Sequence, residues 1–82
     1  RRIAALAHAF NIPVCGHVLP ELHVQLASAV PNGYLVEYVP RTAQILQAMP
    51  AIESGYLVAP QSAGLGLMLD EAAVRQYTVA HP

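Results

Sequence analysis

The hydrophobic positions of the first 40 residues follow two different spacings in turn. Residues 2–10 and about 20–30 carry apolar side chains at helical intervals, and each stretch is followed by Asn or Pro. Residues 12–17 and 34–39 are short and almost continuously apolar, which is typical of buried strands. Because strands alternate with helices, the pattern predicts a βαβ unit with two parallel strands.

The second half of the chain has a less regular pattern. Residues 41–49 predict another helix, and residues 52–59 predict a turn and a short strand. Residues 61–66 are typical of a loop. Asp70 is expected to cap a final helix at residues 71–76, because its side chain can accept hydrogen bonds from the free amides there.

The composition argues that this chain does not fold as an independent monomeric domain. Of the 82 residues, 55% are hydrophobic and only 11% are charged, whereas soluble domains average about 45–50% and about 25%. A parallel sheet must also be covered on both faces. The sequence therefore predicts the end of an α/β protein, or a small module that buries its apolar excess by self-association.

Charge and hydropathy exclude several classes of protein. The net charge is −1 with four Arg and no Lys, which does not give the basic patch of a nucleic-acid-binding protein. No apolar run approaches the roughly 18 residues of a membrane span, and Pro13 interrupts the opening segment too early for a signal peptide. The single Cys15 is compatible with a reducing compartment, and we expect a cytoplasmic protein.

Two residues are the main candidates for chemistry. His17 ends an apolar strand, where the active sites of barrels and open parallel sheets lie, and imidazole exchanges protons near neutral pH. Glu37 interrupts the apolar run 34–39, so we expect a buried carboxylate with a raised pKa. The alternative is that its side of the strand faces water, which a barrel covered on both faces disfavours. If the strands are neighbours, both side chains can face one cavity. The alternative for His17 is a hydrogen bond to a loop.

The other candidate residues are weaker. His8 is expected on a solvated helix face, His23 could approach the site, and His81 lies in the tail. No pair of histidines has metal-ligand spacing, and the Gly64–Gly66 stretch lacks the remaining glycines of a phosphate loop. We therefore expect no metal-binding or cofactor-binding residue within this chain.

An ordered set of short stretches makes the chain recognisable. Those that form the expected strands and crossover helix are residues 12–23 (IPVCGHVLPELH), 26–32 (LASAVPN) and 35–38 (LVEY). They resemble the seventh and eighth barrel strands of the mandelate racemase / muconate lactonizing enzyme family of the enolase superfamily. Later stretches resemble the tail that returns to that family's capping domain: residues 55–60 (GYLVAP), 64–66 (GLG) and 69–71 (LDE). Ala63 departs from the family, which often has Pro there.

The resemblance implies the C-terminal part of a TIM-type (β/α) barrel, within the α/β fold class. Residues 1–50 would be the last strand–helix units, and residues 51–82 the tail that packs toward the capping domain. His17 would be a general acid/base that pairs with an aspartate of the sixth strand. Glu37 would hydrogen-bond the substrate carboxylate.

The same resemblance implies a class of reaction. It is the Mg²⁺-dependent removal of the proton next to a carboxylate, with the metal ligands and the lysine base outside this chain. His17 favours an acid-sugar dehydratase or a racemase over the muconate lactonizing branch. The substrate would be a small carboxylate such as a sugar acid, and the full-length enzyme a homo-oligomer. Alternatives are a fragment of another barrel enzyme with different chemistry, or the self-associating non-catalytic module.

Overall fold

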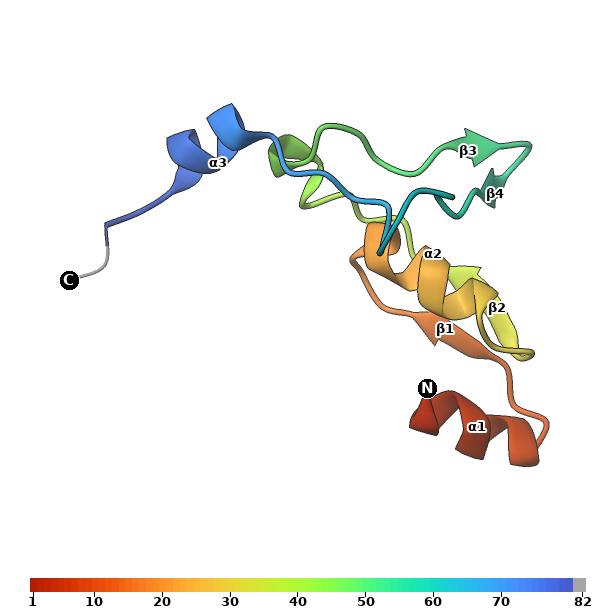
Figure 1. The fold of residues 1–82 in the computed structure, drawn as a ribbon. Coiled ribbons are helices and arrows are strands. Elements are labelled where there is room, and N and C mark those ends of the chain that lie inside the picture. Colours follow the sequence, from red (N-terminus) through yellow and green to blue (C-terminus); the bar gives the residue numbers. More distant parts are fainter. Residues whose placement is uncertain (81–82) are drawn as a thin grey trace.

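The computed structural model describes residues 1–80 of the chain. Short helices and strands follow one another along it (Figure 1). In chain order they are α1 (Arg2–Ala9), β1 (Val14–Gly16), α2 (Pro20–Ser28), β2 (Gly33–Val36), the 3₁₀ turn η1 (Ala43–Ile45), β3 (Ile52–Glu53), β4 (Tyr56–Leu57) and α3 (Glu71–Tyr77).

The first half contains the predicted parallel βαβ unit. Strands β1 and β2 pair in parallel, and α2 connects them and packs against both (Figure 1). The facing residues are Val14 and Gly33, Cys15 and Leu35, and Gly16 and Val36. Pro20 starts α2 in its first turn, where its missing amide leaves no hydrogen bond unmade. This part of the prediction is confirmed, although both strands are shorter than expected.

The predicted helix at residues 41–49 is wrong. Only the 3₁₀ turn η1 forms, and Leu46 after it is extended and bridges to Leu69. The amide of Gln47 donates to the carbonyl of Met68 at 2.9 Å, and the amide of Asp70 donates to the carbonyl of Ile45 at 2.9 Å. The backbone groups that would have bonded within a helix bond instead to the returning tail.

The tail begins with a hairpin and ends with a helix. Strands β3 and β4 pair antiparallel through Ser54 and Gly55, which both have positive φ, at 50° and 82°. This is the backbone twist that two-residue hairpins favour. The sequence predicted a turn and one short strand here. At α3 the prediction is confirmed, because Asp70 Oδ1 accepts from the amides of Ala72 and Ala73 at 2.9 and 3.1 Å.

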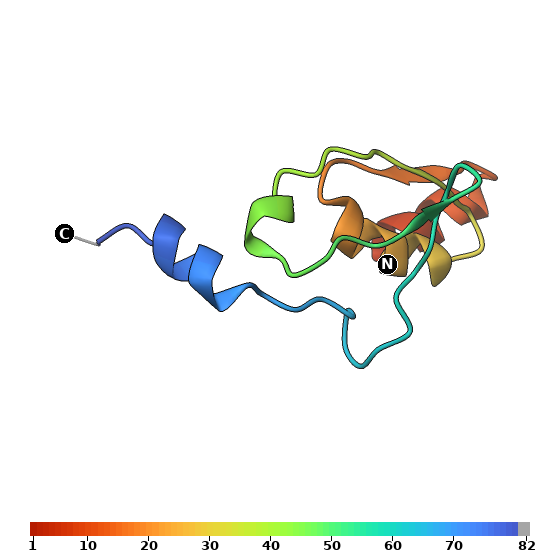
Figure 2. The same cartoon turned by 90° about the horizontal axis from the view of Figure 1, so that it is seen from above.

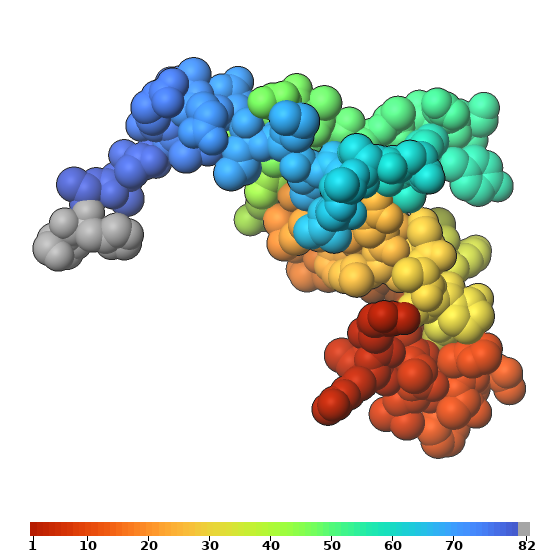
Figure 3. All heavy atoms as spheres, in the orientation of Figure 1, coloured from red at the N-terminus to blue at the C-terminus, as the bar shows by residue number. Residues whose placement is uncertain are grey.

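The chain as a whole is extended. Its radius of gyration is 15.0 Å, compared with about 12 Å for a compact domain of this length. Seen from above, α3 projects away from the βαβ unit (Figure 2), and the space-filling view shows α1 as a separate lobe (Figure 3). Among the described residues the buried hydrophobic core consists of Ala4 and Val24. Within the described part of the chain no helix is both long and apolar enough to cross a bilayer.

Candidate active site at the ends of two parallel strands

The site is built on a strained turn that follows β1. Val18 and Leu19, directly after His17, have φ of 48° and 45°, in the left-handed region that residues other than glycine rarely adopt. Such residues cost about 1–3 kcal/mol each and persist only where the surroundings hold them. Leu19 is also the N-cap of α2. The turn aims the amide of Val18 at the neighbouring strand.

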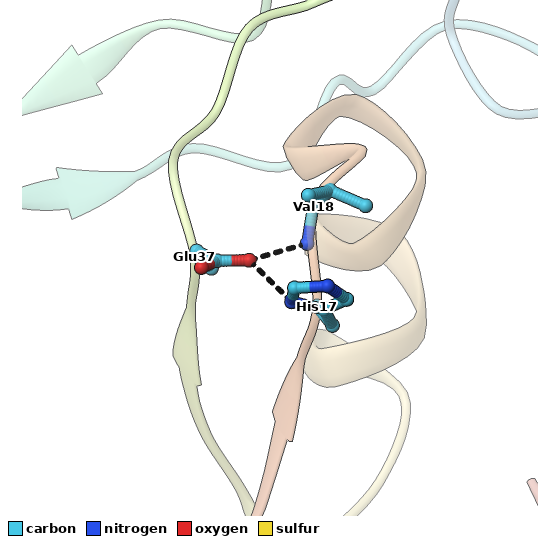
Figure 4. A network of polar contacts seen from close by, with 3 residues as sticks. All are labelled: His17, Val18 and Glu37. Carbon is cyan, nitrogen blue, oxygen red and sulfur yellow. Dashed lines mark hydrogen bonds and ion pairs between the residues drawn. The ribbon is translucent and has the colours of Figure 1, made fainter.

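His17 and Glu37 meet across the ends of the two parallel strands. Each residue directly follows its strand, and His17 Nδ1 lies 2.7 Å from Glu37 Oε2 (Figure 4). The same oxygen accepts from the Val18 amide at 2.7 Å. The side chain of His17 is 87% exposed and that of Glu37 is 46% exposed. The predicted placement of both residues at one end of neighbouring parallel strands is confirmed.

The expectation that Glu37 is buried with a raised pKa is wrong. The hydrogen bond from the Val18 amide is the largest effect and lowers the pKa of Glu37. Desolvation is the next largest and raises it, and the neighbouring His17 and Arg41 lower it further, so the net shift is downward. Glu37 lies one residue beyond β2 rather than inside it. Its carboxylate is therefore stabilised in the ionised form and half-exposed.

The contact also fixes which nitrogen of His17 is available. A carboxylate only accepts hydrogen bonds, so Nδ1 must be the donor in this pair. In the neutral imidazole the lone pair then lies on Nε2, which can take up a proton from outside the pair. Both contacts of Glu37 use Oε2, and Figure 4 shows the other carboxylate oxygen turned away from them. The pair thus presents one proton acceptor and one further polar oxygen.

The remaining histidines take no part in the pair. A Cβ atom added to Gly16 would overlap the ring of His23, so this ring packs on the backbone of β1. His8 is exposed on α1, as predicted, and His81 lies outside the described residues. In the described range, no three His, Cys, Asp or Glu side chains form a group that could hold a metal ion.

A second carboxylate was missed by the sequence reasoning, which treated Glu21 only as a helix-starting residue. Glu21 is 2% exposed, and its Oε1 accepts a hydrogen bond from the hydroxyl of Thr42. Its other oxygen is buried and has no partner among residues 1–80. An acidic residue in the first turn of a helix is usually solvated, so only the position of Glu21 four residues after His17 could have raised attention.

Comparison with known proteins places the chain in a family. Residues 1–73 match the family described as enolase C-terminal domain-like. The chain is 32% identical over 88 aligned residues to D-xylonate dehydratase of Haloferax volcanii, an alignment that covers 96% of this chain and 21% of that protein.

Several solved structures share the fold. An enolase from Bradyrhizobium in complex with magnesium and mandelic acid superposes with a TM-score of 0.85 at 31% identity, covering 95% of this chain and 21% of that one. An enolase of the mandelate racemase subgroup from Agrobacterium tumefaciens superposes with a TM-score of 0.77 at 28% identity, covering 92% of this chain and 22% of that one.

The chain thus spans about one fifth of the length of these relatives. Its predicted resemblance to the mandelate racemase / muconate lactonizing enzyme family is confirmed by the family match and by the relatives. With residues 1–73 matched and a mixed α/β fold shared with its structural neighbours, the chain belongs to the enolase C-terminal domain-like family of the enolase superfamily.

Proposed function

We propose that this chain is part of an enzyme that transfers the proton next to a carboxylate, as an acid-sugar dehydratase or a racemase. The observation that carries the proposal is the His17–Glu37 pair at the ends of two parallel strands. It is supported by similarity to a D-xylonate dehydratase, which is named for a small carboxylate, and to an enolase crystallised with mandelic acid.

In the proposed reaction His17 is the general acid/base. Its Nδ1 is engaged by Glu37, so Nε2 is the atom that would take the α-proton or return one. Glu37 holds the orientation of the ring by accepting from Nδ1.

Glu37 would also contact the substrate carboxylate. A glutamate is ionised at neutral pH, and in the chain as it stands the Val18 amide above all lowers the pKa of Glu37 further. A substrate carboxylate nearby would oppose that charge and favour uptake of a proton by Glu37. The protonated group could then donate from Oε1 to the substrate while Oε2 keeps its contact with Val18.

Magnesium is implied by the similarity to an enolase that binds it. The described residues of this chain do not form a set of three metal-binding side chains, so the ligands would lie in the rest of the enzyme, and no step here runs through the ion. We also propose that the βαβ unit within residues 1–50 is the end of a TIM-type barrel and that residues 51–82 pack toward a capping domain. The full-length enzyme is proposed to be a cytoplasmic homo-oligomer.

The proposal is tested in the full-length enzyme with His17→Asn, Glu37→Gln and the matched control His8→Asn. Turnover and solvent deuterium exchange at the α-carbon are measured with sugar acids and with mandelate. General acid/base catalysis typically contributes about 10²–10⁴-fold, and His17→Asn should reduce turnover by at least that factor. Glu37→Gln should keep part of the activity, because an amide can still donate to the substrate carboxylate.

The control and the melting curves separate chemistry from folding. His8 is exposed on α1 away from the pair, so His8→Asn should retain wild-type turnover. His17→Asn and His8→Asn should melt close to the wild-type temperature, and Glu37→Gln should melt below it at neutral pH because it loses a stabilising carboxylate. A stable His17→Asn enzyme with normal turnover and normal exchange would remove His17 from the mechanism and with it the proposed reaction.

A further inference from the structure

Glu21 and Thr42 link the same two chain segments as the His17–Glu37 pair. Glu37, after β2, accepts from Val18, after β1. Glu21, at the start of α2, accepts from Thr42, in the segment after β2. Each segment therefore supplies one carboxylate to the other.

Burial distinguishes the second link from the first. Glu21 is 2% exposed, so a substrate that reaches the exposed His17 cannot touch it. A buried carboxylate is costly unless it is hydrogen-bonded, and here one oxygen bonds to Thr42 while the other has no partner among the described residues. A side chain kept at this cost, four residues from His17, has a structural or a positioning role.

Because the turn between His17 and α2 is strained, the position of His17 depends on the Glu21–Thr42 contact. Val18 and Leu19 hold left-handed conformations, which persist only where neighbouring contacts over-determine them. The Val18 amide is held by Glu37 on one side of the turn, and α2 is held through Glu21 on the other. Loss of either contact would let the turn, and His17 with it, relax away from Glu37.

We propose that Glu21 and Thr42 form a positioning pair that keeps His17 and the Val18 amide in place against Glu37. The proposal rests on the function proposed above and assigns to it two residues that do not contact the substrate. It predicts an effect on turnover rather than on substrate affinity, because misplacement of a catalytic group by about 1 Å can cost about 100-fold.

The test uses the full-length enzyme with Thr42→Val, Thr42→Ser, Glu21→Leu and the double variant Glu21→Leu/Thr42→Val. Thr42→Val should lower kcat about 10- to 100-fold with KM changed less than about twofold, and Thr42→Ser should restore most of the loss because it keeps the hydroxyl. The kcat of the double variant should be no lower than that of the more damaging single variant, because both single substitutions remove the same Glu21–Thr42 contact.

The matched control is Gln25→Ala. Gln25 lies on the same helix and its Nε2 donates to the carbonyl of Pro60 at 2.7 Å, a partly buried long-range hydrogen bond that does not reach the segment after β2. Loss of this hydrogen bond should lower the melting temperature and leave kcat within about twofold of the wild-type value. If Thr42→Val behaves like Gln25→Ala while His17→Asn is inactive, the positioning role is overturned.

A second readout does not depend on activity. Hydrogen exchange of peptides that cover residues 17–21 reports whether the Val18 amide stays bonded to Glu37. Thr42→Val should speed exchange there about tenfold, and Gln25→Ala should not. If the wild-type enzyme lacks α-proton exchange but Thr42→Val loses protection, the proposed function fails and the positioning contact stands. Unchanged protection in Thr42→Val overturns the positioning pair whatever the activity.

Discussion

At the scale of single residues, Glu37 shows how one backbone donor determines the character of a carboxylate. The apolar run around it predicted burial and a raised pKa, but the strand ends one residue earlier and leaves the side chain half-exposed. The Val18 amide, aimed by a left-handed turn, then lowers the pKa. Ionised Glu37 serves as the acceptor for His17.

This lowered pKa predicts a pH dependence of stability. Since the folded-state pKa of Glu37 lies below the unfolded value of about 4.3, its contribution is fully present above that value and is lost as pH falls through the lowered pKa. At about pH 6–7 the full-length wild-type enzyme should melt at a higher temperature than Glu37→Gln. At about pH 3–4 this difference in melting temperature should become smaller. A difference that stays constant across this range would contradict the assignment.

At the scale of elements, close packing of α2 on β1 depends on a residue without a side chain. The ring of His23 occupies the space where a Cβ atom of residue 16 would lie. At residue 33, the first of β2, the obstacle to a Cβ atom is instead the carbonyl oxygen of Ala27. Both glycines thus let α2 lie close to the strands, one against a side chain and one against backbone.

That contrast gives a prediction with its own control. Gly16→Ala should destabilise the full-length enzyme by about 1–3 kcal/mol, as overpacking typically does. Gly16→Ala should cost much less in a His23→Gly background, because both the ring and the Cβ atom of His23 overlap the added Cβ atom and glycine removes both. Gly33→Ala should be equally destabilising with His23 or Gly at position 23, since the obstacle there is the backbone of Ala27. Denaturant unfolding of the wild type, the three single variants and the two double variants measures these effects; equal recovery at both positions would refute the packing argument.

At the scale of the whole molecule, the chain exposes much of its apolar surface. Its accessible area is 6398 Å², against about 4,800 Å² for a compact protein of this mass. Tyr34 and Leu35 on β2 are 70% and 59% exposed, and they line an open groove between β2, α2 and the β3–β4 hairpin. In water, an exposed apolar surface of this kind favours contact with another protein surface.

We therefore predict that the isolated 82-residue chain self-associates or is poorly soluble and binds no magnesium specifically. Tyr34→Ser/Leu35→Ser, which removes apolar surface from β2, should reduce association, whereas Arg75→Ala on the exposed side of α3 should not. Analytical sedimentation and calorimetric titration with magnesium are the measurements. A monodisperse wild-type monomer that binds magnesium tightly would contradict both parts.

Local signals in the sequence were sufficient for several features. Helical spacing gave α1 and α2, and the Asp70 side chain starts α3 through hydrogen bonds to amides two and three residues on. The alternation of helix and strand gave the parallel βαβ unit, which by itself brings the ends of β1 and β2, and so His17 and Glu37, to one side. The helices and the Asp70 cap depend on neighbours in the chain, and the parallel pairing follows from the order of the elements, so the sequence contains both.

Other features depend on residues that are far apart in the chain, and only the tertiary structure decided them. Residues 41–49 lost their helix because their backbone groups bond to the tail around Leu69. Buried Glu21 meets Thr42 from another segment, and the lowered pKa of Glu37 depends on the Val18 amide, which a left-handed turn aims at it. The sequence by itself determined α1, α2, α3 and the two parallel strands, together with the side chains that follow the strand ends. Solvent exposure, hydrogen-bond partners and pKa were decided by contacts across the fold, because they depend on what each side chain meets in space.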